Sequence, residues 1–197
     1  MTTLTETSAK EKELNSMSMI TTIVVLVIVT ATFSALIAVF FIRAEKSEFW
    51  QHIEVPRILW GTTAILLASS ATLEAARHKL LRHDRQGFFR WTALTTGLAT
   101  LFLIGQLIAW FQVLDSGIVM SHNPHSWFIF LFSGLHGVHI VLGLGGLGYL
   151  LHRTRQEASG PRYQMKTRVT ANGVSIFWHY LDFLWLVLFG LLALWHR

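Results

Sequence analysis

The feature that most constrains this chain is residues 19–42, a stretch of 24 residues without one charged side chain. As an α-helix, a stretch of that length crosses the roughly 30 Å of hydrocarbon in a bilayer. It is longer than the apolar core of a signal peptide, so we expect it to be retained as a membrane span. Four further apolar stretches follow, at residues 58–76, 91–111, 126–151 and 174–195. Runs this long are typical of membrane helices rather than of barrel strands.

The sequence therefore predicts an all-α fold, an integral membrane bundle of five transmembrane helices. Residues 1–18 are polar and predict a cytoplasmic tail, whereas residues 19–197 form a single membrane domain. Charged residues make up only 14% of the chain, against about 25% in soluble proteins, because the apolar stretches carry almost none. The chain has no cysteine, which excludes disulfides, thiolate zinc sites and Cys-bound iron–sulfur clusters of its own.

The basic residues indicate how such a bundle is oriented. With the N-terminus in the cytoplasm, twelve of the 16 Lys and Arg side chains fall on the cytoplasmic side, as the positive-inside rule requires. These twelve are Lys10, Lys12, Arg77, Lys79, Arg82, Arg85, Arg90, Arg153, Arg155, Arg162, Lys166 and Arg168. We therefore expect a cytoplasmic N-terminus and a C-terminus outside. This asymmetry also accounts for the net charge of +5, so no nucleic-acid partner is expected.

Four ionisable side chains lie inside the last two spans at helical spacing. His136 and His139 share one face of the fourth span, and His179 and Asp182 repeat the spacing in the fifth. Polar groups at this depth are costly and usually face the protein interior. They are compatible with an interhelical hydrogen-bond cluster, with a proton relay, or with a metal ligand and its orienting partner. Ligation of one b-type haem between His136 or His139 and His179 is a further interpretation.

Small and polar residues predict how the spans pack together. Gly134, Gly137, Gly145 and Gly148 fall near one stripe of the fourth span, which is typical of a close helix–helix seam. Gln106 is embedded in the third span, and we expect it to hydrogen-bond a neighbouring helix.

Two further observations concern chemistry within the chain. Glu74 lies one turn before Arg77 and His78, so pairing within its own helix is expected. The chain contains no Gly-rich phosphate loop, no Ser-His-Asp order and no HExxH motif. Taken without any resemblance, these residues predict a helical subunit with a buried polar cluster and no complete active site.

Two sequence motifs lie in the fourth and fifth spans. Residues 133–139 read SGLHGVH, which is similar to the small-Gly-x-His-Gly-x-His signature of subunit III of haem-copper oxidases. Residues 177–185 read FWHYLDFLW, which is similar to the family's aromatic-Trp-His-x-x-Asp-x-x-Trp motif and includes Trp178 and Trp185. Weaker similarity extends to residues 62–70 and to Gln106. The resemblance covers most of the chain from the first span onwards.

The resemblance implies a short, five-helix subunit in a bacterial cytoplasmic (inner) membrane. It would hold no metal, no redox cofactor and no catalytic residue, because haem and copper belong to partner subunits in this family. Oxidase subunit I would be its direct partner, alongside other respiratory complex subunits and bound phospholipid. The complex would reduce oxygen to water and pump protons, while this chain stabilises subunit I and supports proton uptake. His136, His139, His179 and Asp182 would serve in packing and hydrogen bonding.

The chain departs from the family pattern at three positions, one of which is Ala109, where the family often has an acidic residue. The family usually has a glutamate in the helix that matches the first span, near Ile28 or Val29, where this chain has none. The Asn of the family's Asn-Thr pair is replaced by Thr62. The alternatives are a haem-b electron-transfer subunit and a subunit III-like protein of a quinol oxidase or nitric oxide reductase system.

Overall fold

The computed structural model describes residues 2–46, 56–115, 124–156 and 161–194. The described residues form five α-helices, which are α1 (Thr2–Lys46), α2 (Ile58–Leu81), α3 (Arg85–Asp115), α4 (Pro124–Arg155) and α5 (Pro161–Leu194). All five contain a segment long and apolar enough to cross a membrane. The prediction of an all-α bundle with five spans is therefore confirmed.

The helices extend beyond the predicted spans. Apolar patterning marks only the part of a helix that lies in hydrocarbon, whereas the backbone hydrogen bonds continue wherever helical conformation persists. The clearest case is α1, which continues through residues 2–18, the predicted polar tail. The cytoplasmic location of that segment stays a prediction.

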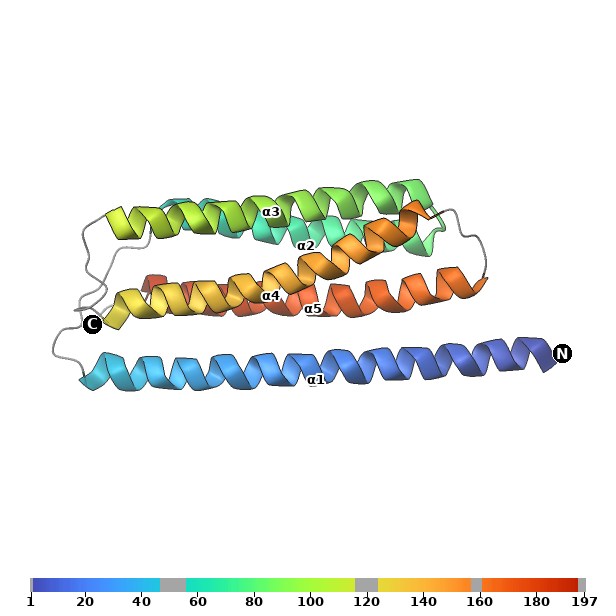
Figure 1. The fold of residues 1–197 in the computed structure, drawn as a ribbon, viewed down its shortest axis with the longest axis horizontal. Helices are drawn as coiled ribbons and strands as arrows, with labels where there is room; N and C mark the ends of the chain where they lie inside the picture. Colours follow the sequence, from blue (N-terminus) through green and yellow to red (C-terminus); the bar gives the residue numbers. More distant parts are fainter. Residues whose placement is uncertain (1, 47–55, 116–123, 157–160, 195–197) are drawn as a thin grey trace.

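The helix α1 lies at the periphery of the bundle, alongside α4 and α5 (Figure 1). Only 17% of the most apolar segment of α1 is buried within the chain, whereas 33–44% of the corresponding segment is buried in each of the other four helices. One polar contact joins it to α5, where the Thr30 Oγ1 and Tyr180 hydroxyl oxygens are 2.6 Å apart. The family glutamate that this chain lacks would lie near Ile28, which is exposed, or Val29, which is buried. That position is therefore at the edge of the contact between α1 and the rest of the bundle.

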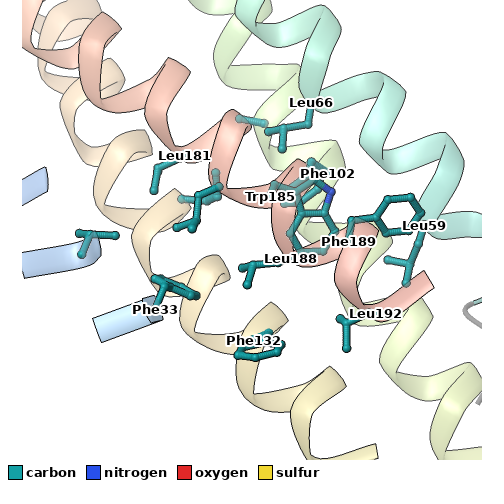
Figure 2. Packing of buried hydrophobic residues seen from close by; sticks show 14 of the residues in the cluster. Phe33, Leu59, Leu66, Phe102, Phe132, Leu181, Trp185, Leu188, Phe189 and Leu192 are labelled. Carbon is teal, nitrogen blue, oxygen red and sulfur yellow. The ribbon is translucent and has the colours of Figure 1, made fainter. Parts of the chain in front are cut away.

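The core lies where α5 meets the other helices, and aromatic rings fill much of it. Figure 2 shows Trp185 and Phe189 projecting from α5 toward Phe102 of α3 and Leu59 of α2. The rings of Phe102 and Trp185 meet edge to face with centroids 5.2 Å apart, a favourable geometry for aromatic pairs. Because α5 carries many residues of this cluster, the neighbouring helices pack around its aromatic face.

One end of the bundle, which we call the basic end, carries Arg82, Arg85, Arg153, Arg155 and Arg168. The N-terminus of α1 lies at the same end (Figure 1). Arg85 Nε donates to the Thr154 carbonyl at 2.8 Å and so satisfies a free carbonyl in the last turn of α4. This contact ties the α2–α3 connection to the end of α4.

The helix α3 begins at the basic end with a side-chain cap. Asp84 Oδ1 accepts a hydrogen bond of 2.8 Å from the Gly87 N–H, and Lys79 Nζ lies 3.3 Å from Asp84 Oδ2. The hydrogen bond from the Gly87 N–H, and after it the bond from Lys79, hold the pKa of this carboxyl below its usual range. Gly87 suits the position because a Cβ there would collide with the capping carboxylate.

Candidate functional site

A ladder of polar contacts joins α2 to α5, and we call it the α2–α5 seam. Its members are Thr63, Ser69 and Ser70 on α2 and Trp178, His179, Asp182 and Trp185 on α5. Thr63 and Ser70 lie two turns apart on α2, and Trp178, Asp182 and Trp185 follow one another at one-turn spacing on α5, while Ser69 and His179 flank these faces. The seam thus brings the Trp-His-x-x-Asp-x-x-Trp motif against residues 63–70 of α2.

The two tryptophans form the outer rungs of the seam. Trp185 Nε1–H donates to Thr63 Oγ1 at 3.0 Å, and Trp178 Nε1–H donates to Ser69 Oγ at the same distance. Each hydroxyl in turn donates a hydrogen bond to a backbone carbonyl of α2. Thr63 donates to Leu59 at 2.7 Å, and Ser69 donates to Leu66 at 2.6 Å. Both indoles are therefore fixed in orientation by fully buried bonds.

Ser70 forms the central rung, between two ionisable side chains of α5. Its Oγ lies 2.6 Å from His179 Nδ1 and also contacts Asp182 Oδ2. Asp182 is only 5% exposed, and its other oxygen, Oδ1, has no hydrogen-bond partner among the described residues. His179 is much more open, with 43% of its side chain exposed. The hydroxyl therefore links a buried carboxyl to a half-exposed imidazole.

Glu74 continues this line toward the basic end. Its carboxylate lies 3.8 Å from His179 Nε2 and 3.6 Å from His78 Nε2. The predicted pairing within α2 is confirmed, because Arg77 Nη1 also lies 3.4 Å from Glu74 Oε2. Arg77 Nε in turn donates to Asn172 Oδ1 of α5 at 3.2 Å. Polar groups thus run without a break from Asp182 to the last turns of α2.

The two histidines of α4 have separate surroundings. His136 is fully buried, with its ring centroid 4.9 Å from that of Trp185 and 6.0 Å from that of Phe102. Neither of its ring nitrogens has a hydrogen-bond partner in the described part of the chain. His139 instead donates from Nδ1 to the Leu135 carbonyl at 2.7 Å and packs against Phe33 of α1.

The three histidines considered as haem ligands have different neighbours. Trp185 lies beside His136 with its ring tilted, Phe102 meets His136 edge to face, and Phe33 lies beside His139. His179 is engaged with Ser70 and Glu74 on the α2 side of α5. No group of three or more His, Cys, Asp or Glu side chains in the described ranges could hold a metal ion.

Gln106 is buried, as predicted, but it makes none of the expected interhelical hydrogen bonds to the residues that the structure describes. Neither its amide oxygen nor its amide nitrogen has a partner among the residues that the structure describes. It lines a small apolar cavity between α3, α4 and α5, beside Trp110 and Ser133. Trp110 makes the α3–α4 hydrogen bond instead, donating from Nε1 to Ser133 Oγ at 2.8 Å. Periodicity placed Gln106 inside the bundle but could not supply its partner.

The predicted glycine stripe of α4 divides into two parts. A Cβ at Gly134 would lie 3.3 Å from Trp110, and one at Gly137 would lie 3.8 Å from Leu103, so both positions face α3. A Cβ at Gly145 or Gly148 would meet no atom within 4 Å in the described structure. A close helix–helix contact at those two positions stays a prediction, and its second helix would have to come from another chain.

The closest approach of α4 to α5 uses two glycines that the stripe analysis missed. A Cβ at Gly143 would lie 2.9 Å from Trp178 Cζ3, and one at Gly146 would lie 2.9 Å from Val174 Cγ2. Both distances are shorter than ordinary carbon contacts of about 3.5–4.0 Å. The three-residue spacing of this pair was the available signal, because it puts both on one helix face.

A groove at the basic end lies between α1, α4 and α5. Its volume is about 370 Å³, and its lining residues are Met17, Ser18, Thr21, Tyr149, Arg153, Lys166, Val169 and Thr170. Arg153 is held in place there, because its Nη1 donates to the Tyr149 hydroxyl at 2.8 Å and its Nε to Thr167 Oγ1 at 2.9 Å. The groove therefore combines fixed positive charge with apolar walls.

Comparisons with known proteins agree with this arrangement. A family model described as cytochrome c oxidase subunit III matches residues 47–197. A probable cytochrome c oxidase subunit 3 from Nocardia farcinica is 28% identical, over 80% of this chain and 78% of the relative. The cytochrome c oxidase subunit 3 of Corynebacterium diphtheriae is 30% identical, over 70% of this chain and 65% of the relative. That of Synechocystis sp. is 27% identical, over 86% and 72% respectively.

The matched region contains the whole α2–α5 seam and both histidines of α4. It also contains four of the five helices that can cross a membrane. The two sequence motifs, the helical bundle and the family match thus agree over most of the chain. This chain belongs to the cytochrome c oxidase subunit III family.

Proposed function

We propose that this chain is the non-catalytic subunit III of a respiratory haem-copper terminal oxidase. In that complex it packs directly against the catalytic subunit I, which holds haem and copper, next to other respiratory complex subunits. The complex reduces oxygen to water and translocates protons, and cytochrome c is the electron donor that the names of the relatives suggest. The chain itself contributes stability to subunit I and an environment for lipid.

The observation that carries this proposal is a half-exposed polar edge that lies well inside the apolar helices α2 and α5. Ser70 lies 11 residues before the end of α2, or about 16 Å along the helix axis, and His179 is bonded to it. The side chains of His179 and Glu74 are nevertheless 43% and 39% exposed. Hydrocarbon solvates such groups poorly, so a neighbouring protein surface is the expected cover.

The distribution of charge supports an orientation for the subunit. The ends of α2 and α4 and the start of α1 lie at the basic end, so the positive-inside rule favours its location in the cytoplasm. The N-terminus is then cytoplasmic and the C-terminus outside. The bacterial relatives support the cytoplasmic (inner) membrane as the location.

The groove at the basic end supports a bound phospholipid. Arg153 and Lys166 offer positive charge for a phosphate, while Met17 and Val169 offer apolar contacts for the start of an acyl chain. Exchange of both basic residues for Gln should lower the phospholipid retained per complex, as measured by lipid mass spectrometry. Arg43→Gln, at the opposite end of α1, is the matched control and should leave that amount unchanged.

Support of proton uptake is the remaining part of the proposal. His78, His83 and His152 are exposed at the basic end. Imidazole nitrogens can both bind and release protons, so such a surface can collect and release protons beside the catalytic subunit. Replacing the three by Gln should slow proton uptake by the intact complex.

Co-purification tests the central proposal. An affinity tag on this chain should recover a haem- and copper-containing subunit, and the donor that this complex oxidises distinguishes cytochrome c oxidase from quinol oxidase or nitric oxide reductase. The isolated chain should show no Soret band. A stoichiometric b-type spectrum in the isolated chain, abolished by His179→Ala, would contradict the proposal. Within the complex, His179→Leu should reduce retention of subunit I, whereas Phe183→Leu, at an exposed apolar position, should not.

A further inference from the structure

The central rung of the seam differs from an ordinary structural contact, because one hydroxyl proton is shared between two possible partners. The Ser70 hydroxyl touches both His179 Nδ1 and Asp182 Oδ2, but it carries only one proton. It can therefore donate to one of these groups while it accepts a proton from the other. Two hydrogen-bonding arrangements are compatible with the same positions of the heavy atoms.

In the first arrangement, the Asp182 carboxyl is protonated and donates to Ser70, whose hydroxyl donates to His179 Nδ1. In the second, Asp182 is a carboxylate that accepts from Ser70, and His179 Nδ1–H donates to the serine oxygen. The first becomes the second when the carboxyl O–H bond breaks, the serine takes that proton, and its original proton moves to Nδ1. All atoms balance, and the serine hydroxyl is regenerated.

We propose that Ser70 relays protons between Asp182 and His179, so that Asp182 is a proton-exchanging site connected to the basic end. This goes beyond the scaffold function and rests on contacts within this chain. The relay loads and unloads one buried carboxyl. It does not by itself drive net transport, because the reverse step restores the first arrangement.

The remaining contacts define the route. Asp182 Oδ1 has no partner among the described residues, so the bond to Ser70 is the hydrogen-bonded path to this carboxyl. When His179 gains a proton, its Nε2–H faces the Glu74 carboxylate at 3.8 Å. Glu74 in turn lies beside His78, whose side chain is 67% exposed, so the proton can leave toward water.

The groups that face the relay come from α2 and α5. They are Glu74, Arg77 and His78 on α2 and Asn172 on α5. In the described part of the chain, α1, α3 and α4 send no hydrogen bond or ion pair to Ser70, His179 or Asp182. The positive charge of Arg77 is already opposed by Glu74, so no uncompensated cation sits beside the imidazole.

Deuterium exchange of the Asp182 carboxyl tests the relay in the intact oxidase complex. The protonated carboxyl band is identified in the infrared difference between wild type and Asp182→Asn, and its shift is followed after transfer to deuterated buffer. In Ser70→Ala, this shift should be slowed by about tenfold or more, since a positioned proton carrier is lost. Ser69→Ala is the matched control, because it removes the bonds to Trp178 and to the Leu66 carbonyl but leaves the contacts of Ser70 in place, and it should exchange at the wild-type rate.

Two further variants keep the test decisive if Ser70→Ala fails to assemble. Ser70→Thr keeps the hydroxyl and should exchange like wild type, whereas His179→Gln keeps a polar side chain that cannot carry a proton and should slow exchange. Wild-type exchange in His179→Gln or in Ser70→Ala would overturn the relay. So would the absence of any Asp182 carboxyl band from roughly pH 5 to 9. Retention of subunit I is measured in the same samples, so failure of the scaffold proposal is seen separately.

Discussion

The contact between Gly143 and Trp178 yields a prediction with a built-in control. Trp178 is fully buried, and its indole is fixed by the bond from Nε1–H to Ser69, so it cannot rotate away from α4. Gly143→Ala would place a Cβ 2.9 Å from Cζ3 and 3.0 Å from Cε3 of that indole. Gly145→Ala, two residues along the same helix, would meet nothing within 4 Å.

The magnitude follows from two opposing effects. Inserting a methyl group into a filled contact typically costs about 1–3 kcal/mol, because side chains or backbone must shift. Both substitutions also gain helix propensity of up to about 1 kcal/mol, which cancels in the comparison. The free energy of unfolding of Gly143→Ala should therefore lie about 1–3 kcal/mol below that of Gly145→Ala.

Reversible unfolding by SDS in mixed micelles can measure this difference. A double-mutant cycle with Trp178→Phe sharpens the assay, because phenylalanine lacks the part of the indole that carries Cε3 and Cζ3. In that background, the cost of Gly143→Ala should fall to near that of Gly145→Ala. Equal stabilities of the two single variants, or an undiminished cost after Trp178→Phe, would refute the account of a glycine-dependent α4–α5 contact.

Three further predictions concern other contacts. Asp182→Asn should weaken retention of subunit I in detergent, because it removes a buried ionisable partner; subunit ratios after purification measure this, and undiminished retention and turnover would contradict it. Thr63→Val should lower the free energy of unfolding by about 0.6–1.7 kcal/mol, and this cost should shrink in a Trp185→Phe background, where the same bond is already absent. The cap of α3 should be lost as pH falls: the pKa of Asp84 is lowered by folding, so its stabilisation is present above the unfolded pKa and disappears as pH falls through the folded one. Hydrogen exchange at the Gly87 amide should accelerate over that acid range relative to its intrinsic rate, and Asp84→Ala should show no such transition.

Periodicity and hydropathy determined most of the fold before any tertiary contact was considered. An apolar run such as residues 19–42 can satisfy its backbone in hydrocarbon only as a helix, so length and composition suffice to predict each span. The pairing of Glu74 with Arg77 and His78 was predictable for the same reason, since neighbours within one helix have fixed separations. The motif around His179 and Asp182 was likewise placed on one helical face by its spacing.

Tertiary structure decided which helix each face meets. The bond between Ser70 and Asp182 joins residues 112 positions apart, and no local pattern specifies such a pair. For the same reason, Gly143 and Gly146 were missed as the close α4–α5 contact, and Gln106 was buried without its expected partner. Within one helix, the 3.6-residue periodicity fixes the direction in which each side chain points. Which helix that side chain meets depends on how the side-chain volumes of all five helices fill the shared interior.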